Sequence, residues 1–78
     1  MKIEIMGPGC PRCQTLESNV KEALEQLGID AEVEKITEIG KIAARGVLST
    51  PGLAIDGKIL STGKLLTVEE LKTMLKQG

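Results

Sequence analysis

Two cysteines separated by two residues give this chain its clearest chemical signal. Cys10-Pro11-Arg12-Cys13 follows an apolar stretch, Lys2–Met6, that is typical of a strand, and it opens a helical pattern. On a first helical turn the two sulfurs come close enough to form a disulfide, and the free N–H groups and positive dipole end of the helix favour the thiolate of Cys10. The chain has no other cysteine, no histidine and no aromatic residue. We therefore expect its chemistry to depend on this pair.

The composition argues against several classes of function. With 78 residues, 41% of them hydrophobic, the chain can form one small domain with an aliphatic core, which we predict over residues 1–78. The lack of aromatic residues leaves no platform for stacking bases or a planar cofactor. Ten basic and eleven acidic residues give a net charge of −1, so no basic field would attract nucleic acid or an anionic membrane.

The start of the chain and its cysteine usage indicate a compartment. The first predicted strand begins at Lys2, which leaves no room for a signal peptide, and no apolar run approaches the length of a membrane span. A cysteine pair without an export signal points to a reducing cytosol, where disulfides are usually transient and catalytic. We expect a cytoplasmic monomer that binds neither nucleic acid nor membrane.

Hydrophobic periodicity and turn residues predict the order β-α-β-α-β-β-α. Strands are predicted at Lys2–Met6, Ile29–Ile36, Leu53–Ile55 and Lys58–Leu60, with Asp56-Gly57 as the turn between the last two. Helices are predicted over Pro11–Leu27, over a short segment capped by Thr37 and ended by Gly46, and from the Thr67–Glu70 capping box onward. In the short helix we expect the inward residues to be Ile39, Ile42 and Ala43.

This order, with the dithiol after the first strand, resembles the thioredoxin fold in its small, glutaredoxin-sized form. The chain is most similar to the thioredoxin-like redox-active disulfide protein 2 group. The residues that carry the resemblance are Gly7-Pro8-Gly9-Cys10-Pro11-Arg12-Cys13, Thr50-Pro51-Gly52-Leu53 and Ala54-Ile55-Asp56-Gly57-Lys58. The resemblance implies an α/β protein with the minimal thioredoxin fold, in which a four-stranded mixed sheet is combined with three helices.

The resemblance implies thiol–disulfide exchange, and the motif suggests a role for each residue. We expect Cys10, at the helix N-terminus, to be the nucleophile and Cys13, one turn further on the apolar face, to be the resolving thiol. Pro11 stiffens the first turn, where its missing N–H has no cost. The cation of Arg12 would lower the pKa of Cys10 if it turns toward the sulfur. A buried, inert cysteine pair is the alternative.

Two further positions gain a role from the resemblance. It implies a cis Thr50-Pro51 peptide that packs against the dithiol and leaves the Thr50 backbone free to pair with an extended substrate, whereas a simple turn is the alternative. Glu4 occupies the place where thioredoxins keep a buried acid that shuttles protons for the resolving thiol. If Glu4 points under the dithiol, burial would raise its pKa and suit it to that relay. Otherwise Glu4 faces water or a lysine.

The expected substrates are protein disulfides. Glutaredoxins grip glutathione with an aromatic residue between the cysteines and a Gly-Gly pair, where this chain has Arg12 and Ser61-Thr62-Gly63-Lys64. Arg45, Lys58 and Lys64 could hold a carboxylate, but each is more simply a solvated charge. We expect no cofactor and no metal, re-reduction by a thioredoxin-reductase-like enzyme, and a largely uncharged docking face. That face would comprise Met6, Pro8, Pro11, Leu48, Thr50 and Pro51.

Two other functions use the same dithiol. A copper or zinc chaperone also places C-x-x-C after a first strand, and two thiolates suit Cu(I). Such domains have the order β-α-β-β-α-β and usually carry Met-Thr before the first cysteine, where this chain has Pro8-Gly9. A binding module that senses redox state would share the chemistry of the catalyst, and the sequence does not separate the two.

Overall fold

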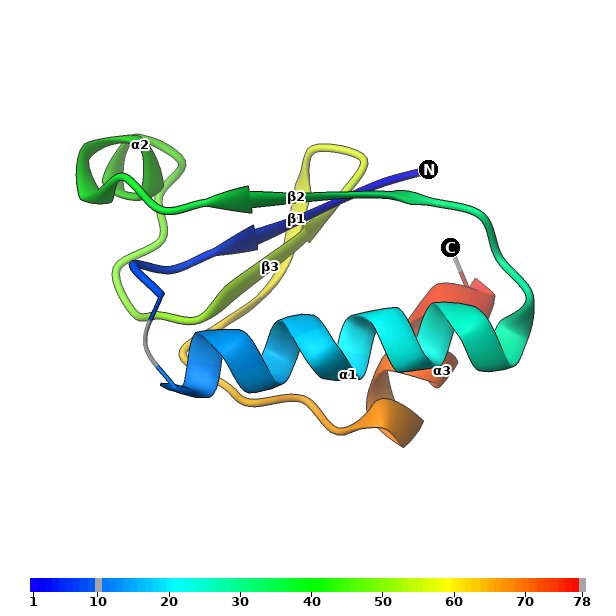
Figure 1. The fold of residues 1–78 in the computed structure, drawn as a ribbon. Helices are drawn as coiled ribbons and strands as arrows, with labels where there is room; N and C mark the ends of the chain where they lie inside the picture. The colour runs from blue at the N-terminus through cyan, green and yellow to red at the C-terminus, as the bar shows by residue number, and fades with distance from the viewer. Residues whose placement is uncertain (10, 78) are drawn as a thin grey trace.

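A computed structural model describes residues 1–9 and 11–77 of the chain (Figure 1). Cys10, the expected nucleophile, lies outside the described residues. The elements are β1 (Lys2–Met6), α1 (Pro11–Leu27), β2 (Glu32–Ile36), α2 (Ile39–Ala44), β3 (Gly52–Ile55), β4 (Lys58–Thr62) and α3 (Val68–Gln77). The predicted order of strands and helices is confirmed.

The four strands form one mixed sheet in the order β2-β1-β3-β4. Strand β1 runs parallel to β2 and antiparallel to β3, and β4 is antiparallel to β3. Asp56 and Gly57 both have positive φ, 50° and 84°, as a tight two-residue hairpin between β3 and β4 requires. These features confirm the minimal thioredoxin fold.

The two faces of the sheet are covered by different helices. Helices α1 and α3 lie on one face and α2 lies on the other (Figure 1). Because side chains alternate along a strand, Ile3 and Ile5 of β1 enter the core under α1 and α3, whereas Met6 packs with Ile42 and Val47 on the α2 side. This alternation decides which residues of β1 can face the start of α1.

The N-terminal cap predicted for α3 is present, whereas the one predicted for α2 is not. Helix α3 opens with the expected capping box, in which Glu70 N donates to Thr67 Oγ1 and Thr67 N donates to Glu70 Oε1, both at 3.2 Å. At α2 the N-cap is Glu38, so the prediction of a Thr37 cap is wrong, and Glu38 makes no side-chain capping bond within the described part of the chain.

Helix α2 and strand β2 are also smaller than predicted. Ile39 is 71% exposed and Ala43 is exposed, so the prediction that both face inward is wrong. A six-residue helix presents little surface to the sheet, and Ile42 is its buried residue. Strand β2 begins at Glu32, where its pairing with Lys2 of β1 begins. Among the described residues, no helix has both the length and the apolar character needed to cross a bilayer.

Candidate active site

Cys13 lies in the first turn of α1, where the sequence placed the resolving thiol. This residue is 5% exposed, in agreement with the predicted apolar face of the helix. The first turn of α1 sits beside the end of β1 and the connection that leads from α2 into β3 (Figure 1). These segments, distant in sequence, therefore form the surroundings of Cys13.

Gly7 makes the approach of β1 to Cys13 possible. A Cβ atom at Gly7 would overlap Cys13 Sγ, and it would lie 3.1 Å from Cys13 Cβ and 3.9 Å from Thr50 Cβ. The Gly7 N–H donates to the carbonyl of Ile36 at 2.9 Å, which fixes this backbone against the end of β2. Gly7 is a site residue, and in the sequence it stands out only as part of the motif that precedes the cysteines. Its signal was a glycine placed directly after a strand.

The Thr50-Pro51 segment also lies beside Gly7, on the side where a Cβ atom would project. Its peptide bond is cis, as the resemblance implied. Pro51 is less than 2% exposed, while Thr50 is half-buried next to Gly7. The structure thus brings Cys13, Gly7 and the Thr50-Pro51 segment together.

Arg12 connects the start of α1 to the segment after β4. Its Nη2 donates to the carbonyl of Gly63 at 3.1 Å, and the Gly63 N–H donates to the carbonyl of Pro51 at 2.9 Å. Gly63 has a φ of 69°, and a Cβ there would lie 2.8 Å from Ser49 Cβ. The guanidinium therefore helps to hold the Thr50-Pro51 segment through Gly63. This contact has no signal in the sequence.

Glu4 does not lie where a proton relay for Cys13 would need it. It alternates with Ile3 and Ile5 along β1, so its side chain is on the α2 face, where Arg45 Nη1 and Nη2 donate to its two carboxylate oxygens at 2.8 and 3.0 Å. Glu4 is 7% exposed. The hydrogen bonds from Arg45 lower the pKa of Glu4 despite the opposing effect of burial. A raised pKa was expected only if Glu4 pointed under the dithiol, and it does not; its partner is an arginine, where the alternative expected water or a lysine.

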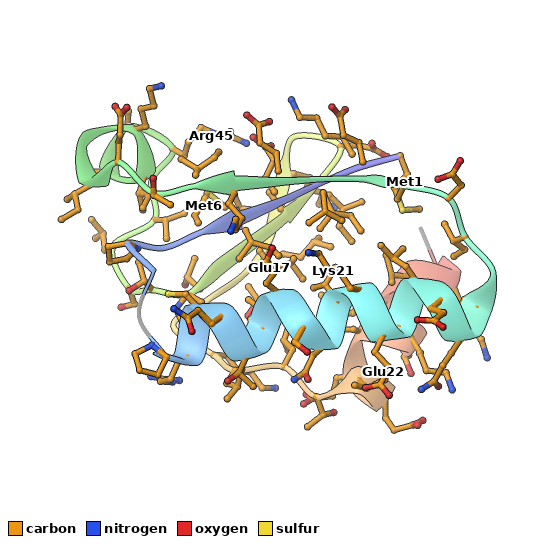
Figure 2. All side chains as sticks on the ribbon, in the orientation of Figure 1. Met1, Met6, Glu17, Lys21, Glu22 and Arg45 are labelled. Atoms are coloured by element: carbon orange, nitrogen blue, oxygen red, sulfur yellow. The ribbon has the colours of Figure 1, made fainter. Side chains whose placement is uncertain are left out.

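A small pocket opens on the α1 side beside Cys13. It has a volume of about 90 Å³, and its walls include Cys13 and Gln14 of α1, Lys35 of β2, and Thr37. Among the described residues that line it, Glu17 is the acidic one. Figure 2 shows Glu17 directed from α1 toward the sheet, whereas Glu22 of the same helix points away from it. In the sequence, Glu17 and Lys35 carry no signal that distinguishes them from other charged residues.

The apolar residues suggested for a docking face are partly exposed and partly buried, and Pro51, at less than 2% exposed, is one of the buried ones. Leu48 is 91% exposed, and Pro8 and Pro11 are exposed. Met6 is completely buried in the cluster under α2, so its expected place on the docking face is wrong. Two of the three cations considered for holding a ligand carboxylate are paired within the chain: Arg45 with Glu4, and Lys64 with Glu70 at 2.8 Å.

The chain is similar over nearly its whole length to known proteins. A family model described as a thioredoxin domain matches residues 1–76. The thioredoxin of Methanothermobacter thermautotrophicus is 49% identical over 75 residues, which cover 96% of this chain and 97% of that protein. The thioredoxin of Methanocaldococcus jannaschii is 50% identical over 74 residues, covering 95% of this chain and 85% of that protein.

Proposed function

Because this chain belongs to the thioredoxin domain family, we propose that it is a thiol–disulfide oxidoreductase that reduces protein disulfides through Cys10 and Cys13. The observation that carries the proposal is the position of Cys13. It is buried in the first turn of α1, against the backbone of Gly7 and close to Thr50. A thiol in this position can attack a sulfur held at the helix N-terminus while staying shielded from outside reagents.

The reaction proceeds in two exchanges. The Cys10 thiolate attacks a substrate disulfide, so that a Cys10–substrate S–S bond forms and one substrate thiolate leaves. Cys13 then loses its proton and attacks Cys10, so that the Cys10–Cys13 bond forms and the second substrate thiolate leaves and takes up a proton. Two electrons pass from the dithiol to the substrate. Pro11 and Arg12 shape the first turn, and Arg12 also holds Gly63.

The substrate is proposed to dock as an extended segment along Thr50 and Pro51. The exposed apolar side chain of Leu48 and the exposed Pro8 and Pro11 support a contact surface that depends little on charge. Such docking is small in area and transient. The rate with a protein substrate should then change little between low and high salt.

The remaining proposals concern partners and location. We propose that a separate thioredoxin-reductase-like enzyme reduces the dithiol again, and that the redox centre is the cysteine pair itself, without cofactor or metal. The single cysteine pair supports a cytoplasmic location, and the net charge of −1 supports a protein that binds neither nucleic acid nor membrane. We also propose that the chain is a monomer. A single domain over residues 1–78 stays a prediction.

The two alternative functions, metal chaperone and redox sensor, agree with the fold to different degrees. The metal-chaperone order β-α-β-β-α-β ends in a strand, whereas this fold ends in helix α3. A redox-sensing module has the same fold as the catalyst, and turnover separates them. A catalyst reduces many equivalents of disulfide per molecule when its dithiol is regenerated, whereas a sensor reacts once and stops.

The experiment combines turnover with trapping. Reduction of insulin disulfides is measured with dithiothreitol as the electron donor, together with the variants Cys10→Ser and Cys13→Ser. We expect turnover by the native chain, stable mixed disulfides with Cys13→Ser, and far fewer with Cys10→Ser. Limited alkylation at neutral pH should modify Cys10 first. No turnover, or preferential labelling of Cys13, would contradict the proposal.

A further inference from the structure

The pocket beside Cys13 raises the question of where the proton of this thiol goes. Only a thiolate attacks a disulfide, and Cys13 is 5% exposed, so bulk water reaches it poorly. Glu4 is committed to Arg45 on the opposite face of the sheet. An acceptor for this proton is therefore to be sought on the α1 side, in the pocket that Cys13 lines.

Glu17 is placed to be that acceptor. It follows Cys13 by four positions on α1, a spacing that puts two side chains on the same side of a helix with Cβ atoms about 5–6 Å apart. Both residues line the same pocket of about 90 Å³, which also contains the polar side chains of Gln14 and Thr37. A space of this size and polarity can hold water that connects a thiol to a carboxylate.

Two lysines hold the Glu17 carboxylate in this position. Lys21 Nζ lies 3.2 Å from Oε2, and Lys35 Nζ, from strand β2, lies 3.7 Å from Oε1. The side chain of Glu17 is 18% exposed, whereas the side chains of Lys21 and Lys35 are 63% and 59% exposed. The acid is therefore the inner member of the group, and the ammonium groups lie toward solvent. Figure 2 shows Glu17 and Lys21 on the side of α1 that faces the sheet.

We propose that Glu17 accepts the proton of Cys13 during the second exchange, directly or through water in the pocket, and that Lys21 and Lys35 position its carboxylate. This inference rests on the proposed oxidoreductase function. In the mixed disulfide, the Cys13 S–H bond breaks and its proton passes to Glu17. The Cys13 sulfur then forms a bond to Cys10 as the bond from Cys10 to the substrate sulfur breaks. The departing thiolate takes up a proton, and Glu17 returns its own proton to solvent.

The test separates the two exchanges by using 5,5′-dithiobis(2-nitrobenzoic acid) as the disulfide. Attack by Cys10 releases one coloured thiolate and leaves a mixed disulfide, and attack by Cys13 releases the second. Rapid mixing therefore records the two steps as separate phases, and Cys13→Ser identifies the first. The test variant is Glu17→Gln, which keeps the shape of the side chain. The matched control is Glu22→Gln, which makes the same charge change on the same helix but on the side that points away from the sheet.

We expect Glu17→Gln to slow the second phase by about tenfold or more near neutral pH, which is at the low end of what a positioned base contributes. The first phase should stay within about twofold of the native rate, which also shows that the fold is intact. The deficit should shrink above about pH 8.5, where thiols ionise without help. Glu22→Gln should match the native chain in both phases.

Three outcomes would overturn the inference. The rate of the second phase could fall by less than tenfold in Glu17→Gln, it could fall by the same factor at every pH, or it could fall equally in Glu22→Gln. A pH-independent loss would mean that Glu17 only supports the packing of α1. The proposed function fails in a different way. If the native chain itself releases no second thiolate and does not reduce insulin, the oxidoreductase function is wrong, whatever the variants do.

Discussion

Glu4 and Arg45 form a two-pronged ion pair on the face of the sheet opposite Cys13. Arg45 directly follows α2, and Glu4 lies in the middle of β1, where it is 7% exposed. The pair therefore attaches the end of a short helix to the centre of the sheet. It also uses the carboxylate that the thioredoxin resemblance suggested for proton transfer.

Replacing Glu4 should affect stability in a pH-dependent way. Hydrogen bonds from Arg45 hold the pKa of Glu4 below its ordinary value. A carboxyl with a lowered folded-state pKa contributes stability above its unfolded pKa, and this contribution is lost as pH falls through the folded value. We expect Glu4→Gln to lower the free energy of unfolding by about 1–3 kcal/mol at neutral pH. The difference should begin to shrink as pH falls below about 4.3, the ordinary value for a glutamate, and should vanish only below the lowered folded value, as measured by urea unfolding across pH.

Glu34→Gln is the control for this prediction. Glu34 pairs with Lys2 at 2.8 Å, but both side chains are about half exposed, so we expect little loss of stability. The rates of the two thiol exchange steps should be unchanged by Glu4→Gln. If Glu4→Gln slowed only the second step, Glu4 would be the proton acceptor of Cys13. That result would contradict our conclusion that Glu4 acts only on the opposite face of the sheet.

Gly7→Ala should disturb both stability and exchange. The added methyl group would overlap Cys13 Sγ, so the start of α1 must move away from β1. We expect a loss of about 1–3 kcal/mol in unfolding free energy, which is typical of overpacking, and a slower second exchange. The control is Gly40→Ala in α2, where an added Cβ meets nothing within 4 Å and alanine favours the helix. Equal stability of the two variants would show that Gly7 is not needed for close approach.

Much of this architecture was predictable because local signals and the final fold agree. The apolar pattern located β1 and α1 with their bounds, the Asp56-Gly57 turn located the hairpin, and the capping box located α3. Each is a short-range preference that the tertiary structure reinforces. The dithiol and the Thr50-Pro51 segment were equally visible, because their residue types are distinctive.

The surroundings of Cys13 were less predictable because they depend on register and on contacts between distant segments. The face to which Glu4 points follows from the alternation of β1 and from the place where α2 ends. The Glu17–Lys35 contact joins α1 to β2, and the Arg12–Gly63 contact joins residues 51 positions apart. Charged residues at these positions look like ordinary surface residues in the sequence. The inward face of helix α2 was predicted wrongly because six residues form fewer than two turns. So short a helix does not repeat the apolar pattern often enough to identify its buried side.

Leu48→Ser should weaken exchange with protein substrates only. Leu48 is 91% exposed, so its replacement should change stability by no more than about 0.5 kcal/mol. In the native chain we expect this side chain to be partly buried against a bound substrate. Because the variant loses this contact, its insulin reduction should be about threefold to tenfold slower. The first phase with the small aromatic disulfide should be unaffected. The matched control is Ile39→Ser, which removes an apolar side chain that is 71% exposed on α2. Equal effects of the two variants would contradict a specific docking role for Leu48.

Arg12→Ala should loosen the segment that follows β4. The Arg12 guanidinium donates to the Gly63 carbonyl, and the Gly63 N–H donates to the Pro51 carbonyl. A hydrogen bond of this kind contributes about 0.5–1.5 kcal/mol. Its loss should therefore speed hydrogen exchange at the Gly63 amide by about twofold to tenfold. Amide exchange followed by nuclear magnetic resonance measures this directly.

The Gly7 amide provides the internal control for Arg12→Ala, because it donates to Ile36 on the β2 side of the site and not toward Gly63. Faster exchange at Gly63 with an unchanged rate at Gly7 would identify Arg12 as a local tie between α1 and the Pro51 segment. Equal acceleration at both amides would instead indicate a general loss of stability. Unchanged exchange at Gly63 would contradict the tie, and the effect of Arg12 on the dithiol would then have to come from its charge alone, which added salt would screen.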